Sequence, residues 1–198
     1  MKTYEEPTLQ EKREHLRISL RVSSLENTFQ NFRPLKGTEK ALQACQTLAS
    51  GKTGWQMLLI YGGVGNGKTY LLEALAIELY KEGKFCGINT YDKMMGFLRR
   101  CINDDLLPNI DVVMDGWCRA ERIIIDDVGM GGSDSVWSMK MLEELVVARY
   151  RNNLFTVLST NIDISELPER VISRFKDPQK ARMVLNSGVD FRPLKGKK

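Results

Sequence analysis

The sequence predicts an α/β domain with a five-stranded parallel sheet and helices on both of its faces. Short apolar runs suited to buried strands recur along the chain, at residues 57–61, 85–89, 123–125, 154–159 and 182–185. Segments with helical spacing of apolar residues separate these runs. Strands that alternate with helices are joined by crossovers, which make neighbouring strands parallel and cover both faces of the sheet.

Capping residues help to place the expected helices. Gly51 suits a helix C-terminus, Thr90 can cap a helix N-terminus, and Pro168 is tolerated in a first turn. The expected helices cover 11–22, 38–50, 69–81, 91–102, 136–151 and 168–175. Residues 103–120 are expected to be irregular apart from a short helix around 112–118.

Length and composition indicate one soluble globular domain. The chain has 198 residues, of which 42% are hydrophobic and 27% charged. It has no apolar run of membrane-spanning length and no apolar stretch behind its N-terminus, so neither a membrane helix nor a signal peptide is expected. The four cysteines form no C-x-x-C pair. They fit reduced thiols in a cytoplasmic protein.

The charge is distributed unevenly. Residues 170–198 hold nine Lys or Arg and two Asp, whereas the whole chain has a formal net charge of +4. A basic C-terminal end indicates a polyanionic partner, most simply nucleic acid. For residues 195–198 a solubilising tail is an equal alternative. The hexapeptide Phe-Arg-Pro-Leu-Lys-Gly occurs twice, at 32–37 and 191–196, although the segments around the two copies do not match.

The strongest motif is a phosphate-binding loop between the strand at 57–61 and the helix that follows it. Its sequence matches G-x-x-x-x-G-K-[ST] and consists of Gly62, Gly63, Val64, Gly65, Asn66, Gly67, Lys68 and Thr69, with Tyr70 next. The glycines let backbone N–H groups turn toward a phosphate chain, and the helix N-terminus favours an anion. Lys68 adds a charge for the outer phosphates, and the hydroxyl of Thr69 is suited to Mg²⁺. These residues predict an ATP site.

A second part of the site is expected at the ends of two other strands. Asp126 and Asp127 follow the apolar run at 123–125. The first acid would hold Mg²⁺, and the second would orient or deprotonate the attacking water. Asn161 follows the run at 154–159 and can bind the γ-phosphate or the water, although an asparagine here also suits a turn.

Two arginines, Arg170 and Arg174, are four residues apart and share one face of the helix at 168–175. An arginine that reaches a neighbouring subunit's γ-phosphate would stabilise the transition state. A solvated basic face is the alternative.

Together these segments resemble the AAA+ ATPases of the DnaC/DnaI helicase-loader and IstB transposition-helper group. The most specific matches are Asp-Asp-Val-Gly at 126–129, Ser-Arg-Phe at 173–175 and the terminal Asp-Phe-Arg at 190–192. The other matching stretches are 28–32, 61–69, 148–152 and 158–161. The resemblance implies an AAA+ P-loop domain at 28–192, between a polar segment at 1–27 and a basic tail at 193–198.

The resemblance also implies roles for single residues. Lys68, Thr69 and Asp126 would bind ATP and Mg²⁺, Asp127 would be the catalytic acid, and Asn161 would take the sensor-1 position. Arg174 would be an arginine finger acting on an adjacent subunit of an ATP-dependent oligomer. The DNA would lie nearest to the helix at 91–102, with Lys93, Arg99 and Arg100 as candidate contacts.

Departures from the group refine these expectations. Asp127 occupies the position where glutamate is usual in AAA+ proteins. The shorter side chain favours slow ATP hydrolysis, which suits a switch better than a motor. Little chain follows Arg192, so little or no C-terminal helical lid is expected. The segment at 1–27 is short for a helicase-binding domain.

Three functions remain open. The first is a helicase loader that binds single-stranded DNA and delivers a replicative helicase. The second is a transposition helper that assembles on duplex DNA and recruits a transposase. The third is a small-molecule kinase, against which the acid pair and the Ser-Arg-Phe motif both argue.

Overall fold

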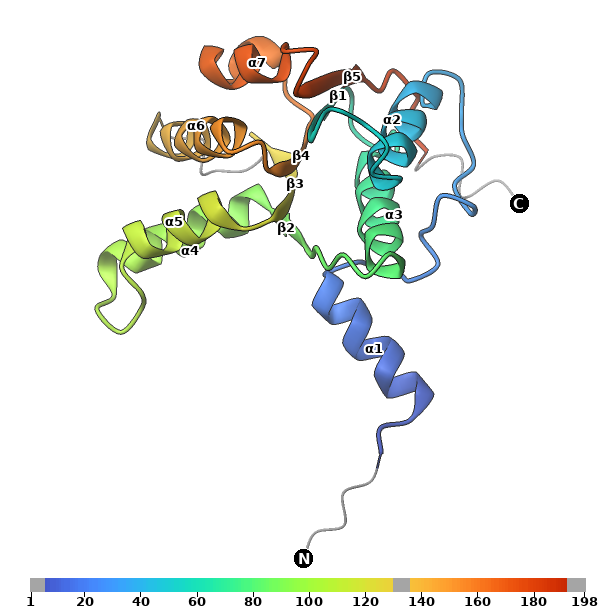
Figure 1. Ribbon diagram of the computed structural model, residues 1–198, viewed down its shortest axis with the longest axis horizontal. Helices are drawn as coiled ribbons and strands as arrows, with labels where there is room; N and C mark the ends of the chain where they lie inside the picture. Colours follow the sequence, from blue (N-terminus) through green and yellow to red (C-terminus); the bar gives the residue numbers. More distant parts are fainter. Residues whose placement is uncertain (1–5, 130–135, 192–198) are drawn as a thin grey trace, which may run out of the picture.

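The computed structural model describes residues 6–129 and 136–191. At its centre lies a parallel sheet of five strands in the order β2-β3-β4-β1-β5 (Figure 1). The strands are β1 (Met57–Tyr61), β2 (Ile88–Thr90), β3 (Arg122–Val128), β4 (Phe155–Thr160) and β5 (Ala181–Leu185). The predicted five-stranded α/β fold is confirmed.

Helices cover both faces of this sheet, as Figure 1 shows. One face carries α2 (Glu39–Ala49) and α3 (Lys68–Lys81). The opposite face carries α4 (Tyr91–Asn103), α5 (Ile110–Arg119), α6 (Val136–Arg151) and α7 (Glu169–Phe175). A short 3-10 helix, Ile164–Glu166, precedes α7, and α1 (Leu9–Leu20) leads into the domain.

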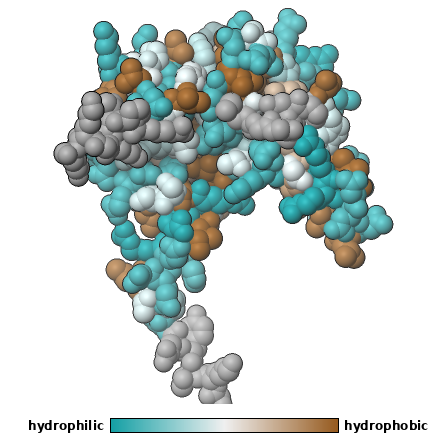
Figure 2. All heavy atoms as spheres, turned by 180° about the vertical axis from the view of Figure 1, so that it is seen from behind, coloured by the Kyte–Doolittle hydropathy of each residue, from teal (hydrophilic) through white to brown (hydrophobic). Residues whose placement is uncertain are grey.

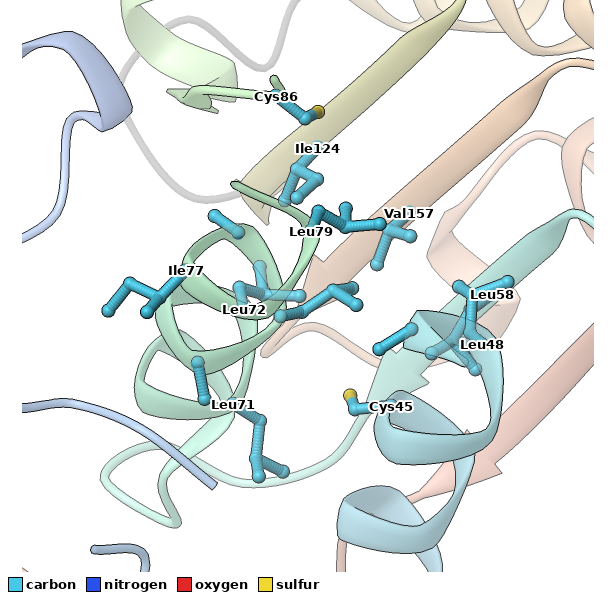
Figure 3. Packing of buried hydrophobic residues seen from close by; sticks show 14 of the residues in the cluster. Cys45, Leu48, Leu58, Leu71, Leu72, Ile77, Leu79, Cys86, Ile124 and Val157 are labelled. Carbon is cyan, nitrogen blue, oxygen red and sulfur yellow. The ribbon is translucent and has the colours of Figure 1, made fainter. Parts of the chain in front are cut away.

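The two faces of the sheet have separate hydrophobic cores because side chains alternate along each strand. In β1, Leu58 and Ile60 face α2 and α3, whereas Met57 and Leu59 face the other layer. Figure 3 shows part of the first core, where side chains of α2 and α3 meet Leu58 of β1, Ile124 of β3 and Val157 of β4. The sheet is therefore buried on both sides, as its apolar runs predict.

Two predicted elements differ from the structure. The second strand was expected at 85–89 but covers Ile88–Thr90, and Phe85 is 55% exposed. Gly87 lies directly under the end of α1, since an added Cβ would stand 2.9 Å from the backbone oxygen of Ser19. The short helix expected around 112–118 is present as α5, but it is longer than expected, with ten residues, and Asn109 caps it by accepting from the N–H of Asp111.

Two parts project from the body of the domain, α1 and the α4–α5 pair (Figures 1 and 2). The base of α1 is anchored by Leu20 and Val22, which are buried in the first core. The carboxylate of Glu73 on α3 also accepts hydrogen bonds from Ser23 and Asn27. The outer end of the α4–α5 pair exposes apolar side chains, among them Ile102, Leu106 and Val112.

Across residues 6–129 and 136–191, none of the helices has both the length and the apolar character that a membrane crossing requires.

Candidate functional site

The glycine-rich loop lies between β1 and α3, at the C-terminal edge of the parallel sheet. Gly62, Gly65 and Gly67 have φ angles of 139°, 72° and 89°, which other residues rarely adopt. These angles turn the backbone back on itself before α3 begins at Lys68. The first N–H groups of α3 have no partner within the helix, so the loop ends in an array of donors suited to an anion.

Lys68 is buried within this loop and is only 4% exposed. Its ammonium group donates to the carbonyl oxygens of Gly62 (2.8 Å) and Gly63 (2.6 Å) and to Oδ1 of Asn66 (3.1 Å). A fixed positive charge therefore lies at the concave side of the loop. Thr69 is exposed in the first turn of α3, and the half-buried ring of Tyr70 packs 5.2 Å from that of Phe32.

Asp126 and Asp127 lie at a β-bulge, where the pairing of β3 with β4 shifts between Ile125 and Val128. Asp126 is 3% exposed, and its carboxylate accepts a hydrogen bond from the hydroxyl of Ser159 on β4. The same hydroxyl accepts from the N–H of Asp127 at 3.2 Å. Ser159 thus fixes both acids, and the bulge is a common device for re-aiming side chains at active sites.

Asp127 has a φ angle of 54°, a left-handed conformation that is uncommon for a residue with a side chain. Its Oδ1 accepts a hydrogen bond of 2.7 Å from Nδ2 of Asn161, which follows β4. The structure therefore brings the two predicted catalytic groups into direct contact. Backbone conformations of this kind cluster at functional sites, where the surrounding structure holds them in place.

Arg174 makes its contacts on the layer of α6 and α7. Its guanidinium carbon lies 4.9 Å from the ring centroid of Tyr150, and its Nε is buried without a hydrogen-bond partner. Arg170, four residues earlier, forms an exposed ion pair with Glu143 at 3.1 Å. The two arginines of the predicted basic face therefore have different surroundings, and among the described residues only Arg170 is paired with an acid.

The segment after β5 packs against the phosphate loop, which the motif alone did not predict. The side chains of Asn66 and Asn186 exchange hydrogen bonds with each other's backbone oxygens, at 2.6 and 3.0 Å. The N–H of Phe191 donates to the oxygen of Gly65 at 2.9 Å. Asp190 lies so close that a Cβ added at Gly65 would stand 1.9 Å from its Oδ1. This segment brings a carboxylate to the edge of the site.

The repeated hexapeptide offered a signal for this contact. Phe32 and Phe191 are the first residues of the two copies, and their ring centroids are 6.1 Å apart. Both rings lie against Gly67 of the phosphate loop. Gly37, the last residue of the first copy, accepts from the N–H of Ser187 at 3.1 Å. Residues 192–196 of the second copy lie outside the described residues.

The residues expected to lie near DNA are only partly covered by the structure. Arg99 donates to the hydroxyl of Ser138 at 2.8 Å and lies over the ring of Trp137, so it ties α4 to α6. Arg100 lies over the ring of Phe97 on its own helix. Arg192 and the basic tail at 193–198 lie outside the described residues.

Magnesium fits two of the oxygen donors proposed for the site. Mg²⁺ is commonly bound by one or two carboxylates together with the phosphates of a nucleotide. Asp126 and the hydroxyl of Thr69 are hard oxygen donors of that kind. The structure, over its described residues, has no group of three His, Cys, Asp or Glu side chains arranged to hold a metal.

The sheet order, in which β4 lies between β1 and the bulged acidic strand β3, and the glycine-rich loop before α3 define an AAA+ P-loop ATPase fold. Residues 24–178 match the family model described as the bacterial DnaA ATPase domain. The chain therefore belongs to the family of the bacterial DnaA ATPase domain.

Known proteins of this family resemble the chain over most of its length. The chromosomal replication initiator DnaA of Geotalea uraniireducens (strain Rf4) is 29% identical over 154 residues, which are 75% of this chain and 34% of that protein. The chain spans about a third of the length of the curated relatives it matches.

A replication initiator and a helicase loader are among the solved structures that share the fold. The replication initiator DnaA bound to AMPPCP and single-stranded DNA aligns with a TM-score of 0.67 and 20% identity, covering 81% of this chain and 50% of that one. The DnaC helicase loader aligns with a TM-score of 0.67 and 17% identity, covering 82% and 97%. The predicted AAA+ class is confirmed, and the family that matches is that of DnaA.

Proposed function

We propose that this protein is a cytoplasmic, ATP-dependent DNA replication factor that binds single-stranded DNA and loads a replicative helicase. One observation carries the proposal: in a chain of the DnaA ATPase family, Ser159 joins Asp126 and Asp127 at the edge of the sheet that carries the phosphate loop. We assign the ATPase domain to residues 28–192, with 1–27 as a polar N-terminal segment and 193–198 as a basic tail.

In the proposed site, the loop from Gly62 to Thr69 and the adjacent Tyr70 bind ATP. Lys68 would exchange its contacts with loop oxygens for phosphate oxygens, which keeps its charge compensated throughout. Asp126 and Thr69 would hold Mg²⁺, which when bound neutralises charge on the phosphates. The hydrogen bond from Ser159 orients the Asp126 carboxylate before any metal arrives.

Hydrolysis would depend on Asp127 and Asn161 acting together. Asp127 would accept a proton from the attacking water, and Asn161 would fix the direction of its carboxylate. Arg174 would serve a neighbouring subunit as the arginine finger, and within its own chain it lies over the ring of Tyr150 on α6. Asp127 is shorter than the glutamate that is usual at this position. This fits slow ATP hydrolysis and therefore a protein that acts as a nucleotide-dependent switch.

The DNA and helicase partners are supported by similar proteins. One structure of the same fold is DnaA with AMPPCP and single-stranded DNA, and another is the DnaC helicase loader. For this chain we propose an ATP-dependent oligomer on single-stranded DNA. A transposition helper that assembles on duplex DNA and recruits a transposase is the alternative.

Fluorescence anisotropy tests this proposal. Labelled single-stranded and duplex DNA of equal length are titrated with the protein, with and without Mg²⁺-AMPPCP. Tighter binding to the single strand that requires the nucleotide supports the loader. Nucleotide-dependent preference for duplex DNA favours the transposition helper, and binding to neither DNA contradicts both.

A further inference from the structure

We propose that Tyr150 is a positioning residue that holds the guanidinium group of Arg174 in place for a neighbouring subunit. The inference rests on the proposed role of Arg174 as an arginine finger. It goes further by identifying what holds the guanidinium group of Arg174 in position, namely an aromatic ring on α6 and not an acidic side chain on α7.

The first observation is the stacking contact. Arg174 is in the last turn of α7 and Tyr150 is in the last turn of α6. The guanidinium carbon lies 4.9 Å from the centre of the ring, which is within the range of a cation–π interaction. A planar guanidinium stacked on a ring loses much of its freedom to rotate while its charge remains uncompensated.

The second observation is that the ring itself is fixed. The hydroxyl of Tyr150 donates a hydrogen bond of 2.6 Å to Oδ2 of Asp177, two residues beyond α7. This bond raises the pKa of Tyr150 and lowers the pKa of Asp177. Lys180 lies 4.7 Å from the ring centre and donates to the backbone oxygen of Tyr150 at 3.4 Å. Asp177 and Lys180, which follow α7 in the chain, therefore hold the ring of Tyr150 in place.

The third observation concerns Arg174 itself. Within the described residues its Nε is buried and has no hydrogen-bond partner, and no acid lies within ion-pair distance. Arg170 on the same helix is instead paired with Glu143. A finger must offer its charge to a phosphate of another molecule, and pairing with an acid of its own chain would oppose this. Stacking on Tyr150 orients the group without neutralising it.

Mixed oligomers separate this role from a general effect on the fold. Lys68→Ala supplies a finger but binds no ATP, and Arg174→Ala binds ATP but supplies no finger, so their mixture hydrolyses ATP only if the finger acts between subunits. The test adds Tyr150→Leu either to the partner that supplies the finger or to the partner that binds ATP. Tyr80→Leu, at a tyrosine 44% exposed on α3, is the matched control.

The proposal predicts an asymmetric result. The mixture of Lys68→Ala/Tyr150→Leu with Arg174→Ala should be about 10²-fold less active than the mixture without the tyrosine change, because a small misplacement of a catalytic group has an effect of that size. The mixture of Lys68→Ala with Arg174→Ala/Tyr150→Leu should be as active as the reference mixture, since its ATP site is intact and its finger comes from the Lys68→Ala subunit. Tyr150→Phe in the finger-supplying partner should restore most of the loss, because it keeps the ring.

The possible negative results distinguish an error in the role of Arg174 from an error in the role of Tyr150. If the reference mixture of Lys68→Ala and Arg174→Ala is inactive, the finger proposed for Arg174 is wrong, and the role of Tyr150 falls with it. If the reference mixture is active and Tyr150→Leu has no effect in the finger-supplying partner, only the role of Tyr150 is overturned. Equal losses in both positions would show a general defect of the subunit and would also overturn it.

Discussion

Nδ2 of Asn161 donates a hydrogen bond of 2.7 Å to Oδ1 of Asp127, between the ends of two adjacent strands of the sheet. The two residues are 34 positions apart in the chain and were assigned separate roles from the sequence. The contact links them into one unit, in which the amide determines where the carboxylate of Asp127 points.

A double-mutant cycle tests this linkage. Asp127→Ala and Asn161→Ala should each lower kcat for ATP hydrolysis, and the double variant should be no slower than the slower single variant, because residues that act as a unit are not additive. ATP affinity should change little in all three. Fully additive losses in kcat would mean that Asp127 and Asn161 act independently.

The second prediction concerns the buried ammonium group of Lys68. Lys68→Ala should abolish nucleotide binding, since it removes the only side-chain cation hydrogen-bonded to the loop among the described residues. Isothermal titration with ATP and with ADP measures the effect. Lys81→Ala, at an exposed ion pair at the other end of α3, is the control and should bind normally. Unchanged ATP affinity in Lys68→Ala would refute the site.

The third prediction concerns the carboxylate of Asp190 beside Gly65. Its negative charge opposes the phosphates of an incoming nucleotide. Asp190→Asn keeps the size of the side chain and should tighten ATP binding by about 1 kcal/mol, roughly fivefold, the order expected for partly solvated charges at short range. The gain should shrink at high salt. Weaker ATP binding by Asp190→Asn would mean that the carboxylate supports the loop instead.

The fourth prediction concerns stability. Arg149 on α6 is fully buried and donates to the backbone oxygens of Trp117, Ala120 and Phe155 and to the hydroxyl of Thr156. Burial lowers the pKa of Arg149 to about 10. Arg149→Ala would leave several buried acceptors without donors, at about 1–3 kcal/mol each. We expect the free energy of unfolding to fall by more than about 3 kcal/mol in urea denaturation.

Arg151→Ala is the matched control for this experiment, because Arg151 is the exposed last residue of the same helix. It should change the free energy of unfolding by less than about 0.5 kcal/mol. If the two variants unfold at the same urea concentration, the hydrogen bonds of Arg149 do not hold α5, α6 and β4 together.

Local patterns predicted the parts of the fold that depend on local chemistry. The boundaries of β1 and α6 were predicted to the residue. An apolar run and a helical spacing of apolar residues can both be recognised from neighbouring positions in the sequence. The phosphate loop and the acids of β3 could be proposed as site residues because binding of phosphate and Mg²⁺ requires particular residue types at a particular spacing.

What the sequence did not reveal depends on contacts between distant segments. Phe85 looks like a strand residue, yet the end of α1 occupies the space beside Gly87 and β2 begins only at Ile88. The pairing of Asn66 with Asn186 spans 120 positions. The repeated hexapeptide led to no prediction that Phe32 and Phe191 meet, because identity of sequence gives no reason for two segments to be in contact.

Sedimentation velocity of the wild-type protein tests the central claim, a switch set by the nucleotide. The protein is compared without nucleotide, with Mg²⁺-ADP and with Mg²⁺-AMPPCP, beside Lys68→Ala under the same conditions. The account predicts larger assemblies only for the wild type with Mg²⁺-AMPPCP. The same distribution of species in all samples, or assemblies that form equally with Mg²⁺-ADP, would contradict it.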